Sequence, residues 1–561
     1  MRVRCFRGYG RVLGAWTGSV LLTIAAFLGS WNMTYANTAN TVRIGVNGSL
    51  TGPLLPYRSP SSIWHTITHL QFAPLLHLTS KLDVSPEIVS RWWYSANGKT
   101  LFMDIAKNAV WSDGQPVTSA DVQLAINYLA SPYYNNVLNG DEGYRVSAIV
   151  GAQTVMLGRA KDVSGFHVIN DHEFSLALRK TNPSILTQDI QGIVPLPAHI
   201  LVGTPFSEFS STAFFKNPSV GDGPYLLQNR VAGALVFGAN SHFVLGSPHI
   251  GLIQYTSISS SALPGLFQAG SIDLYSGVTT SQVQQLSSFA KIDRTAKDQV
   301  VFMGFNDQLP GANDTAFRQA ILYSIDRQKI IQDILSGYGV LANGPVPSFS
   351  KYFDQSLTST YGYNPQTARN LLQKSGFYIG GSSWITTPSG VSLHVILNYM
   401  QGDATSQAVA SAIVHDLQNV AINATLHGPL TIGQMVQAMQ ERNPGIIEAY
   451  VMGWQLGADP RPSTLWLPTS PLNLATMQWN DSNQSGVATN ALLIAEQQTV
   501  AAQNVAYRTT LLKQWQDVIN KNVPVEFLYD PELLVAKSHR LHHVVLSSLY
   551  GPDDAWTWTL S

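Results

Sequence analysis

The chain has 561 residues, of which 45% are hydrophobic and only 12% are Asp, Glu, Lys or Arg, and its formal net charge is −1. This length exceeds that of one ordinary domain and predicts two or three lobes with large cores. A nucleic-acid-binding protein would be expected to carry a basic excess, so the composition argues against that class. With so few charges, the surface must consist largely of Ser, Thr, Asn, Gln and Gly. One interpretation of such a surface is that the protein works in an acidic external habitat.

The N-terminal segment has the pattern of an export signal. A basic start is followed by the apolar stretch Ala15–Gly29, which has the length of a signal-peptide core and is shorter than the roughly 20 residues of a spanning helix. Thr34-Tyr35-Ala36 supplies small residues, so we expect residues 1–36 to be removed by cleavage after Ala36. An uncleaved membrane anchor is the alternative.

The cysteine count agrees with export. The single cysteine, Cys5, precedes the apolar core, so it cannot be the lipid-carrying cysteine that follows such a core in many exported bacterial proteins. The mature chain would have no thiol, which is typical of an oxidising compartment. We therefore expect a periplasmic or extracellular protein without a lipid anchor of that kind.

Along the first part of the mature chain, short strands and helices alternate, which indicates an α/β fold. Residues 41–46 alternate as in a strand, and residues 101–105 form another strand candidate after the turn-like Asn97-Gly98. Thr118 and Asp121 resemble a capping box, and the apolar spacing predicts a helix that continues to Leu129.

Three helices and one strand are predicted in the second part. Residues 315–325 have helical spacing, and Asn364-Pro365 places a cap before a proline at the first position of a helix that stops at Gly376. Residues 407–418 form the third helix, followed by a strand over 421–426. There is no internal repeat and no long low-complexity linker.

Five motifs, in order, resemble one family. They are VWSDGQPVTSADV at 110–122, with SANGKT before it at 95–100, PSVGDGPY at 218–225, FRQA and SIDR at 317–320 and 324–327, YNP through GF at 363–377, and GW followed by DP at 453–460. Together they are similar to the bacterial extracellular solute-binding proteins, family 5, the peptide/nickel type. The resemblance extends over nearly the whole mature chain.

The resemblance implies a two-lobed periplasmic-binding-protein fold (type II, cluster C-like) with an extra subdomain inserted in the first lobe. The expected boundaries are lobe I over 37–75, 186–299 and 521–561, the inserted subdomain over 76–185, and lobe II over 300–520. The implied function is capture of a solute between the lobes and delivery to the permease subunits of an ABC importer. We expect a monomer that needs no cofactor and does not bind nucleic acid.

The motif glycines and charges are interpreted as scaffold. Gly221 and Gly223 are expected to adopt backbone angles that other residues resist, with Pro224 fixing the chain after them. Arg318, Asp326 and Arg327 are expected to form a charge network at helix ends.

The ligand site implied by the resemblance departs from the family's short-peptide pattern. Peptide-binding members hold the ligand's ammonium with an aspartate after the Gly-Trp pair, and here Gly457 stands at that position, with Asp459 two residues further. The arginine of dipeptide binders is also missing, because Met400 and Gln401 occupy that stretch. An unpaired buried ammonium would be costly, so we expect an oligopeptide gripped through its backbone, or a neutral sugar-like solute.

Further contacts are carried over from the family. Trp454 and the adjacent Gln455 would form a wall of the site, and Asn306 would bond the ligand backbone or the hinge. The predicted ligand-contacting loop after the first strand contains Ser49, Leu50 and Thr51.

Catalytic and metal-binding alternatives are weaker. A secreted hydrolase is one alternative, but no G-x-S-x-G elbow, P-loop or H-E-x-x-H motif is present. A nickel or metal-chelate binder is the other. His65 and His69 could share a helix face near His77, although two surface or core histidines are the simpler interpretation. His539, His542 and His543 are interpreted as strand residues, and no metal ligand or catalytic residue is assigned.

Overall fold

The computed structural model describes residues 40–561 except 59–61, 232, 307–308, 382, 442–446, 461–465, 467–483 and 499–503. The predicted signal peptide and its cleavage site at Ala36 lie outside the described residues. Within the described ranges, no helix combines the length and the apolar character needed to cross a membrane.

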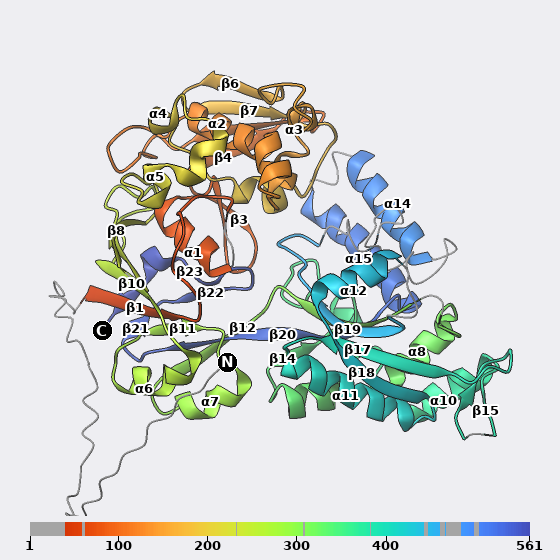
Figure 1. Ribbon diagram of the computed structural model, residues 1–561. Helices are drawn as coiled ribbons and strands as arrows, with labels where there is room; N and C mark the ends of the chain where they lie inside the picture. The colour runs from red at the N-terminus through yellow and green to blue at the C-terminus, as the bar shows by residue number, and fades with distance from the viewer. Residues whose placement is uncertain are drawn as a thin grey trace, which may run out of the picture. The chain divides into compact units, whose positions relative to one another are not determined.

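Twelve of the described strands form one mixed sheet with two sections (Figure 1). The first section contains β1 (Thr41–Val46), β8 (Tyr225–Val231), β9 (Ala234–Ala239), β10 (Leu252–Ser257), β11 (Leu274–Ser276) and β12 (Lys291–Ala296). The second section contains β13 (Val300–Phe305), β14 (Gly339–Leu341), β17 (His394–Met400), β18 (Asn423–Leu430) and β19 (Ala449–Trp454). β1 pairs in parallel with both β10 and β11, so the carboxyl ends of these three strands share one edge.

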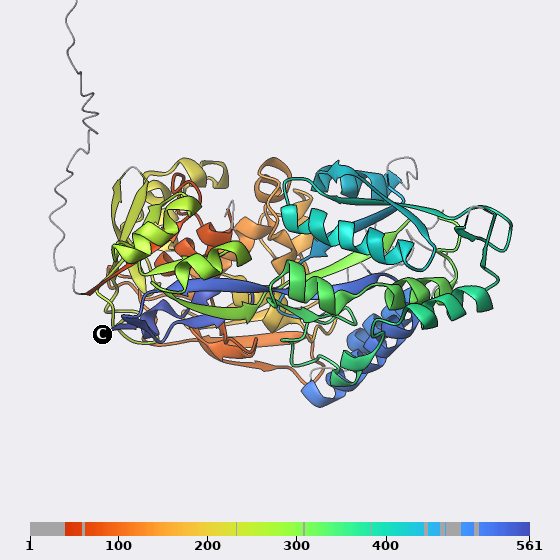
Figure 2. The same cartoon turned by 90° about the horizontal axis from the view of Figure 1, so that it is seen from below.

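One long strand, β20 (Glu526–Lys537), belongs to both sections, and Figure 2 shows it running through them. Its first residues pair with β13 and β14, and its last residues pair with β11 and β12. The chain also passes from β12 to β13 through the short link 297–299. The two sections are therefore joined by backbone at β20 and at this link.

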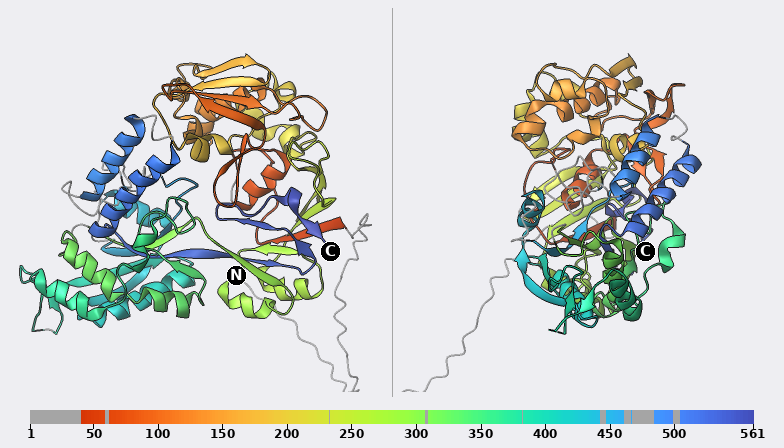
Figure 3. Two further views of the ribbon diagram at one scale, coloured as in Figure 1. Left: turned by 180° about the vertical axis from the view of Figure 1, so that it is seen from behind. Right: turned by 90° about the vertical axis from the view of Figure 1, so that its right-hand side faces the viewer.

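A separate small sheet lies in the segment predicted to be an inserted subdomain. Its strands run in the order β4-β5-β7-β6, with bounds Val89–Tyr94, Thr100–Ile105, Glu173–Ala177 and Phe166–Asn170. Helices α2 (Ser119–Ala130) and α3 (Ala152–Met156) share one hydrophobic core with it. Figure 3 shows this layer in orange and yellow, beside α1 (Ser62–Gln71) in red.

Each section of the large sheet has apolar clusters of its own. In the second section, one cluster contains residues of α8 (Thr315–Ser324), α10 (Pro365–Lys374) and α11 (Ala404–Gln418). The other contains residues of α12 (Ile432–Glu441), α14 (Gln484–Gln498) and α15 (Val505–Asn522). The first section has one cluster with α1 and another with α6 (Leu263–Gln268) and α7 (Thr280–Leu286). These clusters pack the helices against the strands of each section.

Several predicted elements are confirmed. β1 and β5 match the two predicted strands, and α2 begins after Thr118 with the expected capping box to Asp121. Asn364 caps α10 by accepting a hydrogen bond from Thr367 N, and Gly376 follows the helix with a φ of +83°. α8 ends one residue before the predicted end.

Other predictions need correction. α11 begins at Ala404 rather than at 407, because Asp403 caps it by accepting hydrogen bonds from Thr405 N and Ser406 N. The following strand starts at Asn423, since Ala421 has a φ of +64° and belongs to the turn after the helix. Of the three C-terminal histidines, only His542 lies in a strand, β21 (Leu541–His542).

The glycines of the 218–225 motif are structural, but for a different reason than predicted. Neither Gly221 nor Gly223 has a positive φ. A Cβ atom on Gly221 would lie 2.2 Å from the carbonyl oxygen of Gln71, and one on Gly223 would lie 2.4 Å from that of Leu70. The motif therefore needs glycine because the backbone at the end of α1 passes so close to it.

The motif arginines donate most of their described hydrogen bonds to backbone carbonyls. Arg318 donates hydrogen bonds to the carbonyl oxygens of Ala312, Asn522 and Val523. Arg327 donates to those of Ala342, Tyr361 and Phe527. Asp326 accepts a hydrogen bond from Lys329 N at a helix start. They are structural, as predicted, although their partners differ.

Candidate ligand-binding cavity

A cavity of about 670 Å³ lies at the carboxyl edge of β1, β10 and β11. Such an edge is where α/β proteins commonly bind ligands, because the loops that leave neighbouring strands diverge there. Residues that line the cavity come from the loop after β1, from α1, from the end of β11, from the link after β12 and from the C-terminal segment. They include Asn47, Ser49, Thr51, Trp64, Tyr275, Lys297, Tyr550 and Trp558.

The loop after β1 is held in a fixed shape by neighbours of its backbone. Ser257 Oγ donates a hydrogen bond of 2.7 Å to the carbonyl oxygen of Gly48, and Trp64 Nε1 donates one of 3.3 Å to that of Ser49. Arg230 Nη1 donates one of 2.9 Å to Gly52 O. The loop can therefore present polar groups to a ligand without being ordered first, which reduces the entropic cost of binding.

Of the three residues predicted in this loop, Ser49 and Thr51 line the cavity, and their hydroxyl oxygens lie 2.8 Å apart. Leu50 does not line it, because its side chain is 4% exposed and packs in the first section's core with Val46 and Trp64. The structure thus brings two of the three together at the cavity and gives the third a packing role.

The electrostatic character of the cavity is close to neutral. Among the described residues that line it, Lys297 is the only one with a formally charged side chain. Burial raises the pKa of the Tyr275 hydroxyl, so this group is a neutral donor and acceptor. A ligand would thus meet hydroxyls, backbone groups, aromatic rings and one cation, Lys297.

The predicted residues of the second section do not line this cavity in the described part of the chain. Trp454 ends β19 opposite Val300 and is half-buried against an apolar cluster of that section. Gln455 is exposed. Gly457 has a φ of +81°, and its amide donates 3.0 Å hydrogen bonds to the carboxylate oxygens of Asp298 in the link 297–299.

Asp298 therefore fastens the loop after β19 to the link between the sections. It also accepts a hydrogen bond of 3.3 Å from Leu456 N. Burial raises the pKa of the Asp298 carboxyl to about 6, although these amides and Lys297 lower it. Gly457 thus has a structural role at the junction of the two sections.

Asp459 forms a buried ion pair with Arg508. Arg508 donates to both carboxylate oxygens at 2.5 and 2.6 Å, while the Ser184 and Thr187 hydroxyls donate at 3.0 and 2.9 Å. Asp459 is 0% exposed and Arg508 is 2% exposed. Burial alone would raise the pKa of the Asp459 carboxyl, but Arg508 and the hydroxyls outweigh it and hold the pKa below its usual value.

With four protein donors on two buried oxygens, this carboxylate is not available to a ligand's ammonium. The expectation that Asp459 contacts the ligand is therefore not retained. Instead, Asp459 forms an ion pair with Arg508 and accepts hydrogen bonds from Ser184 and Thr187. These two residues follow the small sheet in the chain.

The remaining predicted residues lie at strand ends in the second section. Asn306 follows β13, and its Nδ2 donates a 3.0 Å hydrogen bond to Ile447 O, so its side chain supports the neighbouring backbone. Met400 is half-buried at the end of β17 and packs on the same cluster as Trp454. Gln401 is exposed, with its amide bonded to Leu430 O at 2.9 Å.

Most of the residues that line the cavity were not predicted from the sequence. Trp64, Tyr275, Lys297 and Tyr550 come from segments that it did not connect with the first strand. One signal was available: Tyr275 and Ser276 end a short strand parallel to β1, so they fall on the same edge as Ser49. Recognising that strand would have placed Tyr275 at the site.

The metal-binding alternative depends on the histidines of α1. His65 and His69 share a face of α1, with ring centroids 3.9 Å apart. In the part of the chain that the structure describes, no group of three or more His, Cys, Asp or Glu side chains has an arrangement that could hold a metal ion.

A large, preformed, nearly neutral cavity at the edge of an α/β sheet defines a ligand-binding protein. The sequence profile of the bacterial extracellular solute-binding proteins, family 5 (middle region), matches residues 83–474. That range is more than half of the 561 residues, and the chain belongs to this family.

Curated relatives align over most of the chain. The oligopeptide-binding protein AppA of Bacillus subtilis (strain 168) is 21% identical over 543 residues, which cover 93% of this chain and 94% of AppA. The oligopeptide-binding protein OppA of Lactococcus lactis subsp. cremoris is 22% identical over 493 residues, covering 82% and 78%.

Solved structures confirm the predicted fold class, a two-lobed periplasmic-binding-protein fold. AppA from Bacillus subtilis in complex with a nonapeptide aligns with a TM-score of 0.67 at 20% identity, covering 93% of this chain and 99% of that one. The unliganded open form of the periplasmic murein tripeptide-binding protein MppA gives 0.77 at 18% identity, covering 93% and 98%. NikZ from Campylobacter jejuni in complex with Ni(L-His) gives 0.68 at 19%, covering 93% and 99%.

Proposed function

We propose that this chain is the exported, ligand-capturing component of an ABC importer, that it takes up oligopeptides, and that it delivers them to membrane permease subunits. Family membership supports solute capture. The two curated relatives described above are named oligopeptide-binding proteins. The basic and apolar N-terminal segment supports export to a periplasmic or extracellular space.

The observation that carries the peptide proposal is the nearly neutral cavity of about 670 Å³. Its rim offers hydroxyls and strand-end backbone, which suit the alternating donors and acceptors of an extended peptide. Trp64 and Tyr275 supply aromatic surface for side chains. Because Asp459 is fully paired with Arg508, a clamp on both termini of a dipeptide is not supported, and a longer ligand held through its backbone is favoured.

We further propose that the two sections are the cores of two lobes with the boundaries predicted from the sequence. In this proposal, closure around β20 and the link 297–299 would bring Trp454, Gln455, Met400 and Gln401 onto the ligand. Closure would exclude water and strengthen each polar contact. The ligand would leave chemically unchanged, and the protein would act as a monomer without a cofactor.

The proposal is tested by native mass spectrometry of gently purified protein, followed by thermal unfolding with synthetic peptides of graded length. A bound oligopeptide should co-purify, and peptide at a hundred times its Kd should add about 2.7 kcal/mol to the free energy of unfolding. Cleavage of the peptide would favour the hydrolase alternative. Stoichiometric nickel together with indifference to peptides would favour the metal-chelate alternative.

Lys297 provides a sharper test of ligand polarity. If it faces the peptide's C-terminal carboxylate, Lys297→Met should weaken binding of a free-acid peptide about tenfold, because a charge-assisted contact is lost. The C-terminal amide of the same peptide should bind both proteins equally. Lys291→Met, which removes an exposed lysine on β12, is the matched control.

A further inference from the structure

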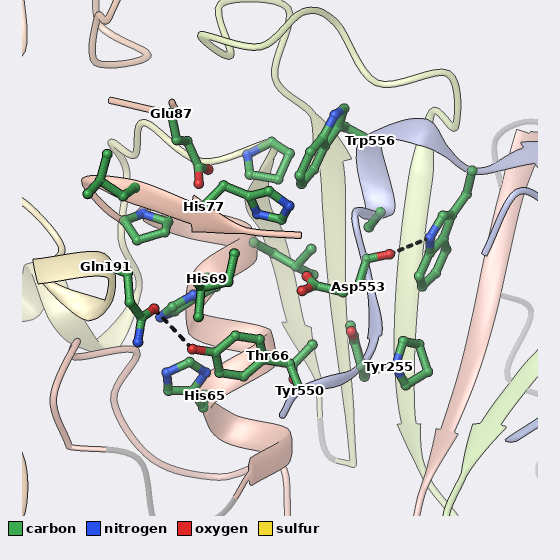
Figure 4. A pocket seen from close by; sticks show the side chains of 18 residues that line it. His65, Thr66, His69, His77, Glu87, Gln191, Tyr255, Tyr550, Asp553 and Trp556 are labelled. Carbon is green, nitrogen blue, oxygen red and sulfur yellow. Dashed lines mark hydrogen bonds between the residues drawn. The ribbon is translucent and has the colours of Figure 1, made fainter. Parts of the chain in front are cut away.

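A small chamber of about 60 Å³ adjoins the ligand cavity on the side of the small sheet. The two spaces share five lining residues: Thr66, Tyr255, Tyr550, Pro552 and Trp558. A single water needs roughly 10–15 Å³ of such volume, so the chamber has room for a few waters or for the polar tip of one side chain. The remaining walls come from α1, β2 (Leu76–Leu78), the turn before β4 and the C-terminal segment (Figure 4).

Glu87 is the unusual group of this chamber. It lies between β3 (Val84–Pro86) and β4, is 4% exposed, and its carboxyl points into the space in Figure 4. Among the described residues, no hydrogen-bond or ion-pair partner of this carboxyl is found. Burial raises the pKa of Glu87 well above its usual value, and the nearby carboxyls of Asp553, Asp222 and Asp554 raise it further.

The other walls add acceptors rather than free cations. Asp553 lines the chamber, and burial with the neighbouring Asp554 raises its pKa to about 6. His65 is neutral near pH 7, since burial lowers its pKa to about 4, and its ring stacks on Tyr550 at 5.0 Å. Burial lowers the pKa of His69 as well.

The nearby cation, Arg145, already has partners, and the nearby His77 is an imidazole whose pKa is lowered by burial. Arg145, whose charge disfavours protonation of both α1 histidines, is bonded to Glu142 at 2.6 Å and to Gln188 O at 3.0 Å. His77 Nε2 lies 3.1 Å from Asp554 Oδ1. The chamber is therefore a buried space with acidic groups and neutral imidazoles, in which a hydrogen-bond donor or a cation would complete the unpaired Glu87.

We propose that this chamber is a specificity subsite that receives the cationic tip of a ligand side chain, an ammonium or guanidinium, with Glu87 as its main acceptor and Asp553 as a second. The inference rests on the proposed peptide function. The backbone and the apolar stem would lie in the larger cavity, and the tip would pass beside Tyr550. As the cation enters, Glu87 would release its proton to solvent, so that a carboxylate and a cation form a charge-assisted pair.

The test is isothermal titration calorimetry with pairs of alanine-based peptides that carry Lys or norleucine at the same position, scanned along the peptide. At one position Lys should bind about tenfold tighter than norleucine. In buffers of different ionisation enthalpy, that Lys peptide alone should show release of about one proton. Glu87→Gln should abolish both the preference and the proton release while retaining affinity for the norleucine peptide.

The controls separate this inference from the proposed function. Glu208→Gln, at an exposed carboxyl of the first half of the chain, should behave as wild type. Asp553→Asn should reduce the Lys preference, and it serves as the second variant if thermal unfolding shows that Glu87→Gln is not folded. Equal binding of Lys and norleucine peptides by the wild type, or a full preference in both variants, overturns the subsite and leaves peptide capture intact. Failure to bind any peptide overturns both.

Discussion

The pairing of Asp459 with Arg508 decides whether this aspartate is structural or contacts the ligand. Asp459→Asn keeps the shape of the side chain and removes its charge, which breaks the buried ion pair with Arg508, a residue that is 2% exposed. Breaking a buried ion pair on one side costs about 3–5 kcal/mol of unfolding free energy. Ser184→Ala removes one hydroxyl that bridges the pair and should cost about 1 kcal/mol.

Equilibrium denaturation in urea measures both effects, and the slope should stay constant if only stability changes. Asp517→Asn is the matched control, because the Asp517–Lys521 pair is largely exposed, with side-chain exposures of 47% and 70%. Its effect should remain within about 0.5 kcal/mol. A structural role for Asp459 is contradicted if Asp459→Asn is as stable as the wild type and loses affinity only for peptides with a free amino terminus.

The next predictions concern Gly457 in the loop after β19, Asp298 in the link 297–299, and the pH of greatest stability. Gly457→Ala should cost about 1–2 kcal/mol in thermal unfolding, since Gly457 has a φ of +81° and its Cβ would lie 2.9 Å from Gln188 Nε2. Glycine substitution at Ala458 should not rescue this variant. Asp298→Asn should reduce the loss of stability between pH 5 and 8 by about 1–1.5 kcal/mol, measured by denaturation at both pH values. The wild type should be most stable in mildly acidic solution, and a melting temperature that peaks at pH 7 or above would contradict this.

The sequence predicted a helix start well where capping residues lie within one turn of it. The capping box of Thr118 and Asp121 and the Asn364-Pro365 start were readable, because each depends on residues within one turn. The start of α11 was not predicted, although Asp403 followed by Thr405 and Ser406 is an equally local signal. The expected reason for Gly221 was wrong, since it depends on the distant Gln71 rather than on its own dihedral angles.

The site was less predictable because distant segments build it. Ser49 and Thr51 could be predicted from the first strand and the family resemblance. Lys297 and Tyr550 could not, because their place at the cavity depends on the pairing of β20 with both sections. Likewise, no spacing rule connects Asp459 with Arg508, which follows it by 49 positions.

The scarcity of charge and the state of the buried carboxyls lead to the same conclusion about pH. Burial raises the pKa of Asp298 and Asp530 to about 6 and that of Glu526 well above its usual value. A raised folded-state pKa means that the stabilisation from protonation is complete below the unfolded-state pKa and is lost as pH rises through the folded value. Asp459 and Asp273, whose pKa values lie below the usual range, lose their stabilisation only in stronger acid. The free energy of unfolding should therefore be greatest at a pH above the values at which Asp459 and Asp273 become protonated and below those at which Asp298 and Asp530 ionise. With 12% charged residues, the surface adds little self-repulsion at that pH.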